Sequence, residues 1–209
     1  MSTQIPTRGP RRRTQQERSA STRAALLDAT IACLLELGYE QTTTLRVAER
    51  AGLSRGAHTH HFQTRPALVA AAIEEMAQRR SAEIGAELAR LPRGEARVAR
   101  ALDLFWRWYT SPLFYAFVDL AAAARTDEDL RASLAPVERE LARTTLLIAR
   151  EMFAEDKDDG TLDPFIGMAL ATIRGHALLP LLQPPGRSAG VQWRFARERL
   201  QELFRTSPP

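Results

Sequence analysis

The sequence predicts an all-α fold, with a small N-terminal group of three helices followed by a larger helical body. Apolar residues recur at spacings of three and four through most of the chain, which is the period of an amphipathic helix. No segment alternates apolar and polar residues with the period of two typical of a half-buried strand. Glycine and proline interrupt the helical pattern repeatedly, so we expect short connections between the helices.

The composition excludes several classes of protein. Of the 209 residues, 44% are hydrophobic and 26% are charged, as in ordinary globular domains and unlike disordered or collagen-like chains. A single cysteine, Cys33, excludes a disulfide framework and a cysteine-built zinc site. The polar stretch 1–18 lacks the apolar core of a signal peptide, and Arg174, His176 and Pro180 interrupt the most apolar stretch. We therefore expect a soluble cytoplasmic protein without a membrane span.

The positive charge of the chain is concentrated near its N-terminus. The net charge is +4, but residues 1–65 hold ten arginines and five acidic residues, which leaves the remainder close to neutral. This distribution indicates either a polyanion-binding head joined to a near-neutral body or an uneven scatter of charge. Residues 1–18 have no apolar periodicity and are predicted to be a disordered basic arm. Its Arg11, Arg12 and Arg13 would enter a minor groove or neutralise phosphates, unless the arm is only a solvated tail.

Three helical segments follow the arm. The first is expected over residues 19–37 and to stop at Gly38, with Cys33 as a buried thiol beside its apolar stripe. Thr43 is a suitable N-cap for a helix over residues 44–51, Gly52 provides the turn, and Ser54 starts a third helix over residues 55–61. Two short helices joined by a glycine turn are typical of a helix-turn-helix, although other helical hairpins share this pattern.

The body is predicted to contain longer helices. Thr64 is expected to cap the first of them, and Asp127 a segment that Pro136 restarts as a new helix. The expected body helices cover residues 65–91, 95–109, 113–124, 136–154, 165–182 and 191–204. The last has Trp193, Ala196, Leu200 and Leu203 on one face.

The stretch from Ala29 to Ala72 has a specific order of turn and core residues. They are Gly38-Tyr39, Thr42-Thr43, Val47-Ala48, Ala51-Gly52-Leu53-Ser54, Gly56, His60-His61-Phe62, Thr64-Arg65 and Ala67-Leu68. At this spacing, the stretch resembles the DNA-binding head of the TetR family of transcriptional regulators. The resemblance covers the first third of the chain, and the remainder matches only in length and helical content.

The resemblance implies a homodimeric repressor in three parts. These are the arm at 1–18, a helix-turn-helix DNA-binding domain at 19–64, and a ligand-binding and dimerisation domain at 65–209. In such proteins the body dimerises through its last two long helices. A small-molecule effector bound in the body shifts the helix that begins near Thr64, and the two heads then no longer fit successive major grooves of the operator.

The residues expected to contact double-stranded operator DNA lie in the head. Because Phe62 must be internal, His58 is expected to lean inward, and Arg55 and Thr59 outward. Arg55 would pair with a guanine edge, while residues at helix N-termini would bind phosphates. The predicted DNA-binding residues are Thr43, Thr44, Arg55, Gly56, Ala57, Thr59, His60, His61 and Arg65, with Arg12 and Arg13 of the arm.

Two arrangements could be taken for metal sites. His58, His60 and His61 do not share one helix face, so DNA-facing or half-buried histidines are favoured over a metal site. The acidic stretch 156–160 departs from a calcium-binding loop in its glycine position and lacks the final glutamate, so it is interpreted as a solvated connector. No metal and no cofactor are expected.

Aromatic residues crowd two neighbouring body helices, where they would form core or line a cavity for an apolar ligand. Arg174 interrupts an apolar helix, and its partner would be an anionic ligand, Asp119 or the second subunit, with a structural or dimer role ranked first. The predicted ligand-binding residues are Phe105, Trp106, Tyr109, Phe117, Asp119, Met152 and Arg174.

These observations predict a regulator and not an enzyme. No nucleophile–base pair, phosphate-binding glycine loop or carboxylate dyad stands out in the sequence. The expected function is a repressor that binds a palindromic operator as a homodimer and is released by a small, largely apolar effector. The alternatives are an activator or a ligand-independent regulator of the same fold, and a helical ligand-binding or catalytic bundle with an incidental helix-turn-helix.

Overall fold

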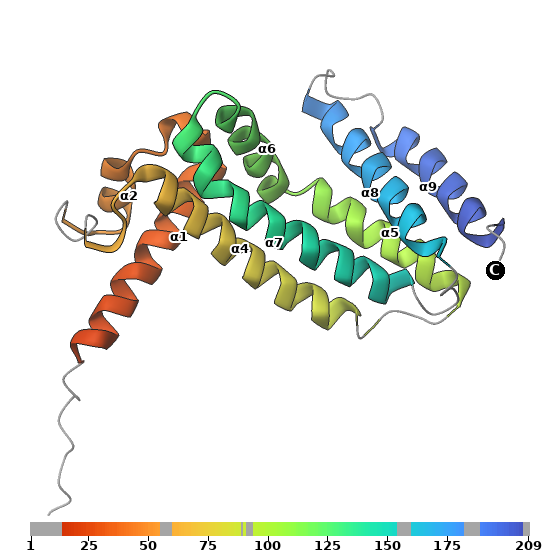
Figure 1. Ribbon diagram of the computed structural model, residues 1–209, viewed down its shortest axis with the longest axis horizontal. Helices are drawn as coiled ribbons and strands as arrows, with labels where there is room; N and C mark the ends of the chain where they lie inside the picture. Colours follow the sequence, from red (N-terminus) through yellow and green to blue (C-terminus); the bar gives the residue numbers. More distant parts are fainter. Residues whose placement is uncertain are drawn as a thin grey trace, which may run out of the picture. The chain divides into compact units, whose positions relative to one another are not determined.

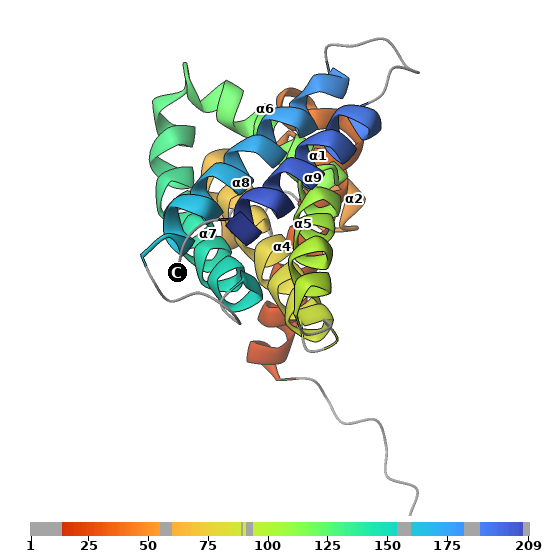
Figure 2. The same ribbon diagram turned by 90° about the vertical axis from the view of Figure 1, so that its right-hand side faces the viewer.

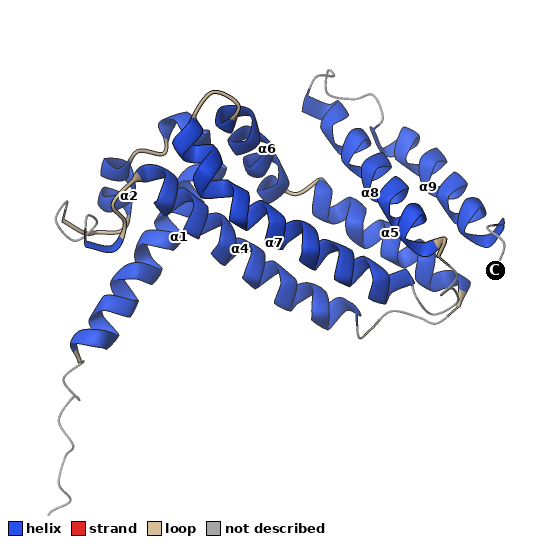
Figure 3. Ribbon diagram, in the orientation of Figure 1, coloured by secondary structure: helices blue, strands red, loops and turns tan. Residues whose placement is uncertain are grey.

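The regular secondary structure of the described residues is helical throughout (Figures 1 and 3). The computed structural model describes residues 14–54, 60–88, 90, 94–153, 160–181 and 189–206. The predicted all-α class is therefore confirmed. The chain divides into two compact units between Ala72 and Ile73, inside a helix.

The first unit begins with α1 (Gln15–Gln41), which starts earlier than the sequence predicted. Thr14 caps it: its side chain accepts a hydrogen bond from the Glu17 backbone N–H at 3.1 Å, and Glu17 Oε2 accepts one from the Thr14 N–H at 2.8 Å. This reciprocal capping box adds residues 15–18 to the helix, so the prediction that they belong to a disordered arm was wrong. Arg12 and Arg13 lie outside the described residues.

Gly38 interrupts α1 as predicted. Its φ of 73° and ψ of 176° are non-helical, and its carbonyl accepts a hydrogen bond from the Thr42 hydroxyl at 2.7 Å. A positive φ is accessible to glycine at little cost, so the chain turns here and enters the next helix.

The short helix α2 (Thr44–Arg50) forms with the predicted cap. The Thr43 hydroxyl accepts a hydrogen bond from the Arg46 N–H at 3.3 Å, and Gly52 forms the following turn with a φ of 67°. Residues 55–59, which include most of the third predicted helix, lie outside the described part of the chain. The core of this unit contains the predicted Val47 and Phe62, together with Leu26, Leu27, Ala29, Cys33, Leu68 and Ala72.

The second unit is a bundle of longer helices. Its elements are the later part of α4 (Arg65–Leu88), then α5 (Glu95–Tyr109), α6 (Pro112–Ala124), α7 (Glu128–Phe153), α8 (Leu162–Leu178), the short 3₁₀ helix η1 (Leu179–Leu181) and α9 (Ala189–Thr206). Helix α5 packs against α7, α8 and α9, and α8 lies beside α9 in both views (Figures 1 and 2).

Helix α7 corrects a second prediction. It runs without interruption through Pro136, where the sequence predicted a restart. Asp127 already caps this helix, since its Oδ1 accepts a hydrogen bond from the Leu130 N–H at 2.9 Å. The helix tolerates the missing proline N–H in its interior, since it packs against α5, α6 and α8.

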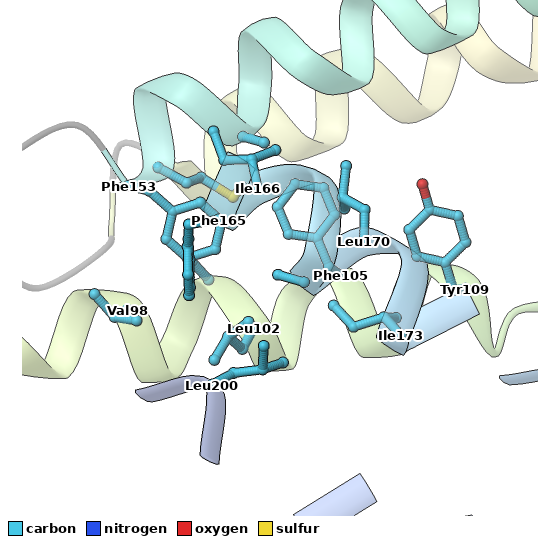
Figure 4. Packing of buried hydrophobic residues seen from close by; sticks show 14 of the residues in the cluster. Val98, Leu102, Phe105, Tyr109, Phe153, Phe165, Ile166, Leu170, Ile173 and Leu200 are labelled. Carbon is cyan, nitrogen blue, oxygen red and sulfur yellow. The ribbon is translucent and has the colours of Figure 1, made fainter. Parts of the chain in front are cut away.

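Aromatic and aliphatic side chains from α5, α7, α8 and α9 form the core of this unit (Figure 4). Phe165 meets Phe153 and Phe204 edge to face, with ring centroids 5.4 Å and 5.0 Å apart. On α9 the buried stripe ends at Phe204, whereas the predicted Leu203 is 40% exposed. Leu162–Leu181 is long and apolar enough to pass a membrane-span test by composition, but Phe165, Ile166 and Ile173 bury one side of it in this core.

Candidate functional site

Part of the predicted DNA-binding surface can be located. Arg55, Gly56, Ala57 and Thr59 lie outside the described residues. Phe62 is buried, as the assignment of inward and outward faces required. The structure describes the remaining predicted head residues Thr43, Thr44, His60, His61 and Arg65.

Four of these polar side chains, at residues 43, 44, 60 and 61, are at least partly accessible. Thr43 and His60 are exposed, and Thr44 and His61 are half-buried. The two imidazole rings meet edge to face with centroids 5.6 Å apart. These groups are available to accept or donate hydrogen bonds to a phosphate or a base edge.

Arg65 makes contacts inside the head. Its guanidinium lies 3.8 Å from the centroid of the Tyr39 ring, and its Nη2 donates to the Tyr39 carbonyl oxygen. Its Nε atom is buried and has no hydrogen-bond partner among the described residues. Arg65, which the sequence predicted to contact a DNA phosphate, thus connects the start of α4 to the end of α1.

An ion pair fixes α2 against α1. Arg50 donates from both terminal nitrogens to the Glu36 carboxylate, at 2.6 Å and 2.5 Å. The hydrogen bond from Arg50 lowers the pKa of Glu36. Nearby, burial raises the pKa of the Cys33 thiol, which fits the predicted inert core thiol.

The second unit contains a cavity of about 240 Å³. Helices α4, α5, α6 and α7 and one residue of α8 form its wall, which is predominantly apolar. The lining residues are Ile73, Ala77, Arg80, Trp108, Tyr109, Leu113, Phe114, Phe117, Val118, Ala121, Glu138, Leu141, Ala142, Thr145 and Arg174. A neighbouring groove of about 280 Å³ shares Phe117, Ala121 and Glu138 with this cavity.

Three of the seven predicted ligand-binding residues, Tyr109, Phe117 and Arg174, line the cavity together. Phe105 and Met152 are fully buried in the core, and Trp106 stacks on Trp193. Asp119 is exposed and is not part of the lining. Ile73 and Ala77 also line the cavity but were not predicted, because the sequence pattern of a cavity wall is the same as that of a core.

Arg174 differs from the buried residue that the sequence suggested. It is exposed at the edge of the cavity, and its Nη2 donates to the Tyr109 phenolic oxygen at 2.8 Å. The guanidinium carbon lies 5.1 Å from the centroid of the same ring. Within the described chain its partner is therefore Tyr109 and not Asp119. On the same helix His176 Nδ1 lies 2.8 Å from the Thr172 carbonyl oxygen.

Helices α8, η1 and α9 also carry exposed apolar side chains. Six of the ten exposed large apolar side chains among the described residues lie between Met168 and Leu203, and Phe195 is 64% exposed. The six are Met168, Leu178, Leu181, Val191, Phe195 and Leu203. Within the ranges that the structure describes, no group of three or more histidine, cysteine or acidic side chains is placed to hold a metal ion.

Comparisons with known proteins agree with this arrangement. Residues 26–72 match the family model for "Bacterial regulatory proteins, tetR family". The chain is 31% identical over 183 residues to the HTH-type transcriptional regulator CymR of Pseudomonas putida, covering 83% of this chain and 86% of that protein.

Two solved structures share the fold over nearly their whole length. A putative transcriptional regulator from Saccharomonospora viridis in complex with choline aligns with a TM-score of 0.66 at 15% identity, over 90% of this chain and 97% of that one. The regulator FadR from Bacillus subtilis in complex with stearoyl-CoA aligns with a TM-score of 0.62 at 14% identity, over 89% and 99%. The chain belongs to the TetR family of helix-turn-helix transcriptional regulators, which bind DNA and are not enzymes.

Proposed function

We propose that this regulator is a repressor that binds a palindromic operator as a homodimer and is released by a small, largely apolar effector. DNA binding itself follows from membership of the family. Repression, the symmetry of the operator and the release by effector are the parts that we add. We place the protein in the cytoplasm, where operator DNA lies.

The observation that carries this proposal is that α4 contributes residues both to the core of the head and to the wall of the cavity. The α4 residues Leu68 and Ala72 belong to the core of the head, and Ile73 and Ala77 line the cavity of the body. A ligand that moves the wall residues of α4 would act on the same continuous helix that contributes to the head core. Such a mechanism needs a coupling free energy of about 1–3 kcal/mol between effector and DNA binding.

The apolar surface of α8 and α9 supports the homodimer. Large exposed apolar groups such as Met168 and Phe195 are costly on a monomer but are typical of a helix-pair interface between copies. A two-fold dimer places two identical heads against two half-sites, so its operator would be palindromic.

A gel-shift experiment with the DNA upstream of the protein's own gene tests the proposal. We expect a discrete complex, and we expect the double variant Arg55→Ala with Thr59→Ala to lose it. The matched control is Arg205→Ala, which removes an exposed arginine at the end of α9. Unchanged DNA binding by the double variant would overturn the assigned recognition residues.

Effector control is tested by a thermal-shift screen of small organic molecules followed by gel shift. We expect a compound that raises Tm to weaken the DNA complex. A stabilising compound that strengthens DNA binding would support the activator instead. A complex that no stabilising compound alters would support a ligand-independent regulator.

A further inference from the structure

We infer that the effector is a small organic carboxylate, which places its apolar body in the cavity and its carboxylate on Arg174 and Tyr109. This inference rests on the proposed function and names the chemistry of its effector. The arrangement of one guanidinium and one phenol at the edge of an apolar wall carries it.

The two polar groups form a receptor for an anion. Tyr109 is buried, and its phenolic oxygen accepts one hydrogen bond from Arg174, so the phenolic proton is left to donate to a ligand oxygen. A guanidinium has five N–H donors, and only one of those on Arg174 is used by Tyr109. Two adjacent donors, one of them cationic, match the two oxygens of a carboxylate.

The charges around the cavity favour an anion over a cation. Among the described residues, four arginines and one carboxylate line the cavity and its neighbouring groove: Arg80, Arg125, Arg131, Arg174 and Glu138. Arg80 and Arg131 are paired with glutamates outside the lining, at 2.7 Å and 2.8 Å. The two remaining positive charges, on Arg125 and Arg174, exceed the single negative charge of Glu138.

The other lining residues determine which group the ligand carries beside its carboxylate. Trp108, Phe114 and Phe117 present aromatic rings, and Leu113 and Leu141 add aliphatic surface. The rings of Tyr109 and Phe114 meet edge to face with centroids 5.0 Å apart, and this contact packs the cavity wall beside the anion receptor. A volume of about 240 Å³ suits a compact apolar group.

Calorimetric titration of the full chain with matched probes tests the inference. The probes are hexanoate, cyclohexanecarboxylate and 3-phenylpropanoate, each with its own amide and its own primary amine. We expect at least one carboxylate to bind at least about tenfold more tightly than its amide, as for a hydrogen bond to a charged group, and the amines to bind more weakly still. No preference for any carboxylate over its amide, or tighter binding of an amine, would overturn the inference.

Two variants test whether the preference for carboxylate over amide depends on Arg174 and Tyr109. Arg174→Gln is expected to bring the carboxylate-to-amide ratio close to one, and Tyr109→Phe to reduce it partly. Tm of each variant without ligand reports whether it is folded. The control Arg100→Gln removes an exposed arginine of α5 that is not part of the cavity lining, and it should keep the preference. A full preference in Arg174→Gln would contradict the assignment.

The inference and the proposed function fail in different ways. A protein that binds a carboxylate without any change in operator affinity keeps the ligand assignment and loses ligand-controlled repression. A protein that binds and leaves its operator normally, but binds no carboxylate, keeps the proposed function and loses the ligand assignment.

Discussion

The indole ring of Trp106 stacks face to face on that of Trp193, with centroids 4.8 Å apart and planes 5° from parallel. This contact joins α5 to α9 and uses a residue that the sequence assigned to the ligand. Trp106→Ala is therefore expected to lower the free energy of unfolding by about 3 kcal/mol, as for other truncations of a packed aromatic residue. Urea denaturation of the full chain measures this loss.

The control for Trp106 is Leu147→Ala, which truncates a 49% exposed side chain of α7 and should leave stability nearly unchanged. Probe binding to the folded variant provides the second readout. Unaltered stability combined with a loss of ligand binding in Trp106→Ala would return this residue to the ligand site.

Arg65 is expected to act through Tyr39. Its guanidinium stacks on the ring and donates to the carbonyl, so Arg65→Ala should cost about 1–2 kcal/mol of stability. A phosphate contact would contribute about 0.9 to the slope of log K against log salt concentration. We expect that slope to be unchanged in Arg65→Ala, measured by fluorescence anisotropy on operator DNA. A slope reduced by a full contact would restore the role that the sequence suggested.

The local signals in the sequence were sufficient for the caps and turns of the head that the structure describes. Caps and turns depend on neighbouring residues, so Gly38, Thr43 and Gly52 could be assigned from the chain alone. The extension of α1 was missed because the capping box requires a reciprocal pair, Thr14 and Glu17, inside a stretch that otherwise looks disordered.

The cavity could be predicted only in part. Arg174 stood out because a charged group interrupts an apolar helix, and Tyr109 because it belongs to a crowd of aromatic residues; both signals are visible in one sequence. Phe105 carries the same aromatic signal and is core. Which apolar side chains face an empty volume depends on how five helices pack, and helix periodicity contains no such information.

The Glu36–Arg50 pair should make the stability of the head depend on pH. The pKa of Glu36 is lowered in the folded state, so its stabilising effect is present above the ordinary glutamate pKa and is lost as the pH falls through the folded value. Glu36→Gln should therefore be less stable than the wild type at neutral pH, and the difference should shrink at an acidic pH below the ordinary glutamate pKa of about 4.3. Urea titrations at the two pH values measure this.

Glu40→Gln is the matched control for that pair, since it removes an exposed carboxylate from the same element, and it should show a smaller difference at neutral pH. A constant deficit in Glu36→Gln at both pH values would show that the glutamine disturbs packing. It would contradict a stabilising role of the charge.

Phe195 is the most exposed of the large apolar side chains in the described chain, at 64%. In a two-fold interface one substitution occurs on both subunits, so Phe195→Glu would bring two carboxylates into an apolar contact. We expect the wild type to sediment as a dimer at micromolar concentration and Phe195→Glu as a folded monomer with greatly weakened operator binding. Leu147→Glu, at a 49% exposed position of α7, should stay dimeric. Because the head is untouched in both variants, loss of operator binding with loss of the dimer would show that two heads must act together. A dimeric Phe195→Glu would remove α9 from the interface.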